Sequence, residues 1–216
     1  MMSVDAERPR ITLGLSLDPR SHSYSSPTPP TLSVTAALHA SSPITVLIWH
    51  SALHPHLALR QGAFQITDLS TATVVKQLSI MLSRAPIQRK LGGPDDAHFV
   101  TIYPETPVTV STLFGNPSGV AGKPLPEGHE GRLRQAAGGM AVARSVCGVD
   151  GLRLGTRYRL EIVDGVHRSL TVDWWKWGTR DEVLAKECEP ADLGEGDGSL
   201  VMEAEDGSKV EFETTE

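Results

Sequence analysis

Val172-Asp173-Trp174-Trp175-Lys176-Trp177-Gly178 contains three of the four tryptophans of the chain. Tryptophan buries more apolar surface than most side chains, so such a cluster marks either a core seam or a surface on which a ligand stacks. Successive side chains of a strand point to opposite faces. Trp174 would therefore share one face with Val172, and Trp175 and Trp177 would share the opposite face. We therefore expect Trp174 in the core. Trp175 and Trp177 either pack under a following helix or line a ligand-binding opening.

Outward from this stretch, alternating apolar and polar residues predict short strands along most of the chain. The clearest is residues 11–17, where Ile11, Leu13, Leu15 and Leu17 alternate with small polar residues. The predicted strands cover residues 11–17, 32–38, 44–49, 64–67, 74–80, 98–102, 108–112, 158–163, 170–174, 200–204 and 209–213.

Turn residues between these strands predict how they pair. Ser41-Ser42-Pro43, Asp164-Gly165 and Asp206-Gly207 each predict an antiparallel hairpin between the flanking strands. Pro104 and Pro107 predict a strand that bends or changes sheets there.

Helical patterns are rare in this sequence. Thr179 is a suitable N-cap for a short helix over residues 180–186, with acidic residues in its first turn. Residues 132–146 show roughly helical apolar spacing, weakened by Gly138-Gly139.

Many short strands, 20 glycines and 15 prolines favour an all-β fold. We expect an antiparallel immunoglobulin-like β-sandwich without the Cys-Trp-Cys arrangement of antibody domains; a closed barrel is the competing architecture. The expected organisation is a single domain over residues 1–216. Its main sheets span 10–114 and 152–180, with a flexible Gly/Pro-rich insertion at 115–151 and an acidic helix and hairpin extension at 181–216.

Charge and composition exclude several functional classes. A net charge of −6 argues against sequence-independent binding to nucleic acid, which requires basic side chains. The charged first ten residues do not resemble a secretory signal, and no apolar run approaches the ~18 residues of a transmembrane helix. Cys147 and Cys188 give neither a disulfide framework nor a CxxC metal motif. We expect a cytoplasmic protein with no cofactor that binds neither nucleic acid nor membranes.

Three segments carry a resemblance to a known group of proteins. They are a hydrophobic strand ending in Trp49, the Leu91-Gly92-Gly93-Pro94-Asp95-Asp96 turn before Phe99, and residues 154–180, with a YRL-x-x-x-DG stretch leading to WW-x-WG. In this pattern the chain resembles a group of uncharacterised intracellular proteins of filamentous fungi. The resemblance covers about half of the chain and implies an intracellular β-sandwich. Because that group has no known activity, the resemblance assigns no catalytic residues to this chain.

Histidines and aspartates supply the candidate chemical groups. His50, His54 and His56 are the densest set of potential metal ligands, although Pro55 argues against one continuous helix through all three, and a solvated loop is the simpler interpretation. Asp95 and Asp96 are candidates for a general base with a like-charged neighbour, or simply turn residues. His98 and Asp173 complete the candidate acid and base residues.

These observations favour a non-catalytic ligand-binding or protein-interaction module. Trp175, Trp177 and Trp49 are its expected ligand contacts, the expected partner is a small apolar molecule or a protein, and a free sheet edge would allow a homodimer. The alternative is a cofactor-free isomerase, cyclase or lyase that acts on an apolar natural product of secondary metabolism. A closed, tryptophan-lined cavity would favour that enzyme, and a solid core would favour the binding module.

Overall fold

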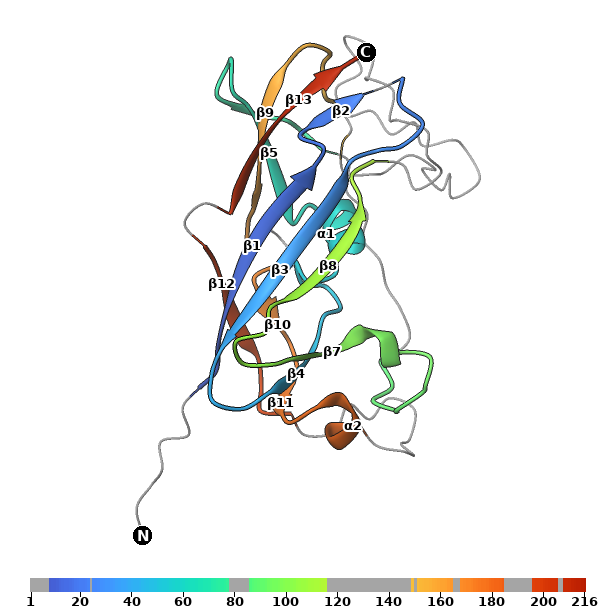
Figure 1. Cartoon of the computed structure of the whole chain (residues 1–216), viewed down its shortest axis with the longest axis vertical. Helices are drawn as coiled ribbons and strands as arrows, with labels where there is room; N and C mark the ends of the chain where they lie inside the picture. Colours follow the sequence, from blue (N-terminus) through green and yellow to red (C-terminus); the bar gives the residue numbers. More distant parts are fainter. Residues whose placement is uncertain are drawn as a thin grey trace, which may run out of the picture.

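The computed structural model describes residues 8–23, 25–77, 86–115, 149, 151–164, 168–184, 196–205 and 208–216. Within these residues the fold is mostly β, with three sheets and two short α-helices (Figure 1). The prediction of an all-β class is thus confirmed. No helix among the described residues is long and apolar enough to cross a membrane. The predicted helix at 132–146 and both cysteines lie outside the described residues.

Each sheet combines strands that are distant in the sequence. The first sheet has the order β10 (Thr171–Val172), β12 (Leu200–Ala204), β1 (Arg10–Asp18), β3 (Thr31–His39) and β8 (Val108–Leu113). The second has the order β2 (Ser21–Ser23), β13 (Lys209–Thr215), β9 (Arg157–Ile162), β5 (Phe64–Asp68) and β6 (Thr73–Val74). The third has the order β11 (Trp175–Trp177), β4 (Ile44–Leu47) and β7 (Phe99–Ile102).

Strand alternation builds the first sheet as the sequence predicts. β3 pairs antiparallel with β1 on one side and with β8 on the other. Its residues Leu32, Val34 and Ala36 are fully buried, whereas Ser33 and Thr35 face outward. On that outer face Ser33 and Thr35 form hydroxyl–hydroxyl hydrogen bonds of 2.8 and 2.9 Å with Ser111 and Thr109 of β8.

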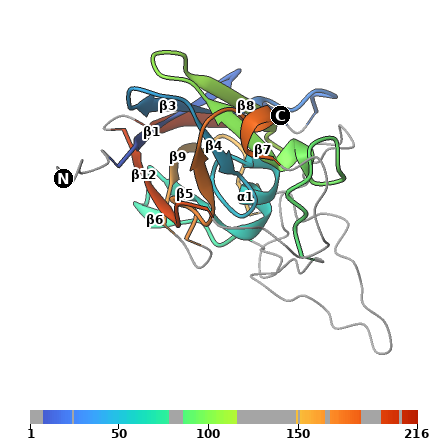
Figure 2. The same ribbon diagram turned by 90° about the horizontal axis from the view of Figure 1, so that it is seen from below.

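The second sheet contributes aromatic side chains to the same core. Tyr158 of β9 stacks on Phe212 of β13 with ring centroids 5.5 Å apart, and Phe212 meets the edge of Phe114 at 5.2 Å. Buried side chains of both five-stranded sheets belong to one continuous apolar cluster. Seen from below, β3 and β8 lie on one side, β5 and β6 lie on the other, and helix α1 (Pro55–Gln61) lies beneath β8 (Figure 2).

Two stretches that are distant in the sequence, residues 10–23 and 200–215, run parallel to each other. Each stretch contributes strands to both large sheets. Ile11 of β1 pairs with Met202 of β12 in the first sheet, and Ser21 of β2 pairs with Glu213 of β13 in the second. Between these points the pairing is interrupted, because β12 and β13 belong to different sheets; β9 pairs with the other edge of β13. The prediction of antiparallel pairing is therefore wrong at these two pairs, whereas the other strand pairs among the described residues are antiparallel. β12 and β13 also belong to the large sheets and not to a separate extension at 181–216.

The three predicted hairpins are not formed. β3 and β4 lie in different sheets, as do β9 and β10, and β12 and β13. The local turn residues are compatible with a hairpin, but each second strand buries its apolar side chains against a more distant partner. By contrast, the sheet change predicted at Pro104 and Pro107 is confirmed, since β7 belongs to the third sheet and β8 to the first.

The short helix after Gly178 is confirmed, although it is shorter than predicted. Helix α2 spans Arg180–Val183, and the Glu182 carboxylate accepts hydrogen bonds from the Thr179 backbone N–H and hydroxyl. Helix α1 was not predicted. Pro55 begins α1 instead of interrupting it, because a proline in the first turn needs no backbone hydrogen bond.

The tryptophan stretch contributes to two separate cores. The chain bends at Asp173, between β10 and β11, so strict alternation fails there. Trp175 is 4% exposed and belongs to the main core, whereas Trp174 packs in a smaller cluster with Leu47, Phe99 and Leu184. The expectation that Trp175 faces away from the main core is wrong. Trp177 is half-buried and meets the edge of Trp175 at 5.5 Å.

Candidate functional site

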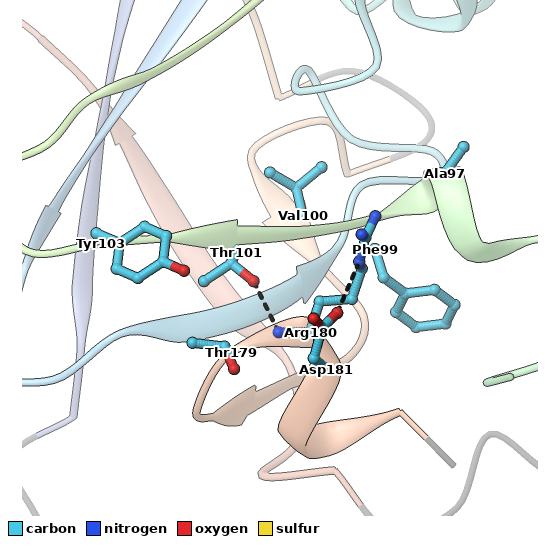
Figure 3. Close-up of a pocket in the computed structure, with 8 residues that line it drawn as sticks. All are labelled: Ala97, Phe99, Val100, Thr101, Tyr103, Thr179, Arg180 and Asp181. Atoms are coloured by element: carbon cyan, nitrogen blue, oxygen red, sulfur yellow. Dashed lines mark hydrogen bonds and ion pairs between the residues drawn. The ribbon is translucent and has the colours of Figure 1, made fainter. Parts of the chain in front are cut away.

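An open hollow of about 430 Å³ lies between β7 and the start of α2 (Figure 3). One wall is formed by β7 and the residues next to it, namely Ala97, Phe99, Val100, Thr101 and Tyr103, and the other wall by Thr179, Arg180 and Asp181. Tyr103 is 46% exposed, so its phenol ring is accessible to a ligand.

Hydrogen bonds fix the floor of the hollow. The Arg180 backbone N–H donates to the Thr101 hydroxyl at 2.8 Å, and the Thr45 hydroxyl of β4 donates to the Gly178 carbonyl at 2.9 Å. Thr45 and Thr101 are also 3.2 Å apart through their hydroxyl oxygens. Thr45 and Thr101 are directly paired across β4 and β7, so the sheet register sets where α2 begins.

Arg180 is the main polar group of the hollow. Its Nε atom lies 3.7 Å from Asp96 and 3.8 Å from Asp181, both longer than a tight charged hydrogen bond. Among the described residues, these ion pairs involve Nε and leave the two terminal NH₂ groups for other acceptors. Arg180 and the two carboxylates near it, Asp181 in the hollow and Asp96 beside it, together carry a small net negative charge, which favours an uncharged polar ligand over an anion.

A second cluster of polar aromatic side chains forms around Trp49, after β4. The rings of His50, His54 and His98 all meet Trp49 edge-on, with centroid separations of 5.5, 5.7 and 4.7 Å. The His54 and His98 rings are 5.4 Å apart. The structure thus brings together Trp49, His98 and two of the three candidate metal ligands.

His54 is neutral at physiological pH. Burial lowers its pKa to about 4, helped by the nearby charge of His98 and opposed by a backbone hydrogen bond. Burial also lowers the pKa of His56, together with the positive charge of Arg60.

His50 is not arranged as a metal ligand. The Trp49 indole N–H donates to His50 Nε2 at 2.8 Å, so the lone pair of that nitrogen is occupied. The other ring nitrogen, Nδ1, lies 3.4 Å from the Gln61 carbonyl oxygen and 3.2 Å from its amide nitrogen. Nowhere in the described part of the chain do three His, Cys, Asp or Glu side chains form a group that could hold a metal ion.

The candidate aspartates are separated. Asp95 is 4% exposed and accepts a hydrogen bond from the Gln88 backbone N–H at 2.7 Å, which anchors the turn before β7. Asp96 faces Arg180 instead, so the two carboxylates contact different groups. Asp173 is exposed at the bend between β10 and β11.

The hollow therefore includes residues that sequence patterns did not single out. Thr101, Tyr103 and Arg180 line it, whereas Trp49, Trp175 and Trp177 do not. The Pro104–Pro107 break and the Thr179 N-cap both mark its borders in the sequence. Their convergence depends on the pairing of β4 with β7, which no local pattern reveals.

Comparison with known proteins adds no relative. No protein-family model, curated protein or solved structure matches the chain.

Proposed function

We propose that the chain is a non-catalytic binding module, built on an immunoglobulin-like sandwich, that takes up a short extended segment of a partner protein at β7. The observation that carries this proposal is the open polar hollow beside an edge strand. β7 is the last strand in the order β11-β4-β7, and its side chains form one wall of the hollow.

Backbone geometry supports recognition of an extended segment. The Ile48 N–H donates to the His98 carbonyl, so residues 98, 100 and 102 direct their backbone groups toward β4. Thr101 directs its N–H and C=O to the opposite edge. A peptide strand beside Thr101 would gain main-chain hydrogen bonds while one of its side chains enters the hollow.

The lining of the hollow specifies the chemistry of that side chain. Arg180 offers N–H donors, Asp181 and the adjacent Asp96 offer acceptors, and Tyr103 offers an exposed ring. These groups suit an uncharged polar side chain, such as an amide, that both donates and accepts hydrogen bonds. The partner is thus a protein with a polar extended segment.

Peptide selection tests this function. A displayed library of random linear peptides is selected against the whole chain, and the affinity of the resulting binders is measured by calorimetry. We expect Arg180→Ala to weaken binding about ten- to a hundredfold, the usual effect of losing a hydrogen bond to a charged group. Arg10→Ala is the matched control, because Arg10 is also an exposed arginine paired with a carboxylate but lies on β1.

Amide chemical shifts locate the binding site in the same experiment. Peptide binding should shift the NMR signals of Thr101, Tyr103 and Asp181 most strongly. The proposal fails if selection yields no binder, or if the two arginine variants bind the selected peptides equally well.

The alternative function is a cofactor-free isomerase, cyclase or lyase acting on an apolar natural product. The cluster of Trp49, His54 and His98 favours it, because it brings two imidazole rings, which can transfer protons, together with an indole ring. Such chemistry requires an enclosed apolar cavity, whereas the hollow at β7 is open and polar. The buried positions of Trp174 and Trp175 also support the binding module over the enzyme.

A further inference from the structure

β8 differs from the other edge strands of the three sheets. The described edges are β10, β2, β6, β11 and β7, with two to four residues each, whereas β8 has six. Its sequence, Val-Thr-Val-Ser-Thr-Leu, contains no charge, proline or glycine. Natural proteins usually block a long edge strand with such residues, because an unblocked edge pairs with other strands.

The direction of the β8 backbone groups follows from one hydrogen bond. The Phe114 N–H donates to the Pro30 carbonyl, which faces it across the antiparallel pair of β8 and β3. Residues 108, 110 and 112 therefore also direct their N–H and C=O toward β3. Thr109, Ser111 and Leu113 direct theirs to the outer edge of the sheet.

These three residues are self-complementary about Ser111. If a second β8 lies antiparallel with Ser111 opposite its own copy, Thr109 of each strand faces Leu113 of the other. All three pairs are then of the hydrogen-bonded kind, and each exchanges two N–H···O=C bonds. A twofold axis midway between the two Ser111 residues satisfies every outward backbone group from 109 to 113.

Side chains on both faces suit this pairing. On the outer face, Leu113 is 36% exposed and would be covered by Thr109 of the partner, while hydroxyl bonds to β3 already hold Thr109 and Ser111 in place. On the inner face, half-buried Val110 would lie opposite Thr112. No like charges oppose each other within the paired residues.

We propose that the chain forms a twofold-symmetric homodimer in which β8 pairs antiparallel with β8 of a second copy, centred on Ser111. The first sheet of one copy and the first sheet of the other then form one continuous sheet across the dimer. This interface is on a different sheet from the β7 hollow, so the dimer does not rest on the proposed function.

Charged substitutions at Ser111 test both the dimer and its register. Sedimentation velocity and light scattering should show that the wild-type chain reaches twice its 23.2 kDa mass as its concentration rises. Ser111→Lys and Ser111→Glu should each be monomeric, since the twofold axis places two like charges opposite each other. An equimolar mixture of the two variants should form a heterodimer, because the same register then places Lys opposite Glu.

Matched controls separate loss of the interface from loss of the fold. Ser111→Ala keeps the backbone N–H and should dimerise like the wild type, and far-UV circular dichroism should be the same for all variants. Arg180→Ala should leave the dimer intact, which distinguishes this interface from the peptide site. The proposal is overturned if the wild type stays monomeric, if Ser111→Lys dimerises like the wild type, or if the mixed variants do not associate.

Discussion

His54 contributes to the fold through both its backbone and its side chain. Its carbonyl accepts the first backbone hydrogen bonds of α1, while its ring lies against Trp49 and His98. Burial of this ring among aromatic neighbours keeps it neutral. Sequence spacing suggested a shared role for His50, His54 and His56, but the ring that approaches His54 is that of His98, which lies far away in the sequence.

We predict that the chain loses stability in mild acid because of His54. Its pKa is about 4 in the folded chain, below the ordinary histidine value of 6.5. The unfolded chain therefore binds more protons between these values, and the free energy of unfolding falls as the pH drops from 6.5 to 4. Allowing for solvent around the half-buried ring, we expect a loss of about 1–2 kcal/mol.

Urea unfolding at several pH values measures this loss. His54→Gln removes the titrating group, so the variant should show a shallower decrease in unfolding free energy between pH 6.5 and pH 4 than the wild type. Equal pH slopes for the two chains would show that another group controls acid stability.

At the scale of elements, strands with a strict period of two were predicted well. β1 and β3 match their predicted ranges closely, because the apolar residues of each pack on one face of a sheet. α1 was missed although the sequence contains its signals, with Pro55 in the first turn and Gly62 just after the last residue, in a left-handed conformation with φ of 76°. The sequence instead suggested a solvated loop around Pro55, with a metal site as the alternative.

Gly178 controls the start of α2 and hence one wall of the hollow. Its φ of 111° is unfavourable for other residues, and a Cβ there would lie 3.1 Å from Val183 Cγ1 and 3.2 Å from Glu182 Oε2. Because Glu182 caps α2, we predict that Gly178→Ala lowers the free energy of unfolding by about 2–3 kcal/mol and weakens peptide binding.

Gly198→Ala is the matched control for this substitution. Its φ of 95° is similarly strained, but a Cβ there would meet no atom within 4 Å. Gly198→Ala should lower the free energy of unfolding by only the backbone strain, about 1–2 kcal/mol. Urea denaturation of both variants compares the two costs, and equal losses would mean that contact with α2 is unimportant.

At the scale of the whole molecule, pairing was the least predictable property. Residues 200–204 and 209–213 were correctly identified as strands, yet they join different sheets. Alternation determines which face of a strand is buried, but it does not select the partner strand. The candidate site has the same limitation, since Thr101 and Arg180 meet only because β4 pairs with β7 and β11.

We predict that the chain does not fold without residues 200–216. β12 lies between β10 and β1, and β13 lies between β2 and β9, so their removal opens both large sheets at internal positions. The buried side chains of Met202, Val210 and Phe212 would also be lost from the core. Circular dichroism and NMR dispersion should report a largely unfolded 1–199 fragment.

Addition of a synthetic 200–216 peptide provides the control. The peptide should restore the β-sheet signal of the fragment, because it supplies the missing central strands in trans. Cooperative thermal unfolding by the 1–199 fragment alone would contradict this prediction.

The parallel run of the two distant stretches also determines when the fold can form during synthesis. β1 is synthesised long before its parallel neighbour β12, and β9 is synthesised before its antiparallel neighbour β13. Neither large sheet can therefore be completed until β12 and β13 have been synthesised. Pairing between strands so distant in the sequence forms slowly, and until it is complete the exposed apolar strands are prone to aggregation.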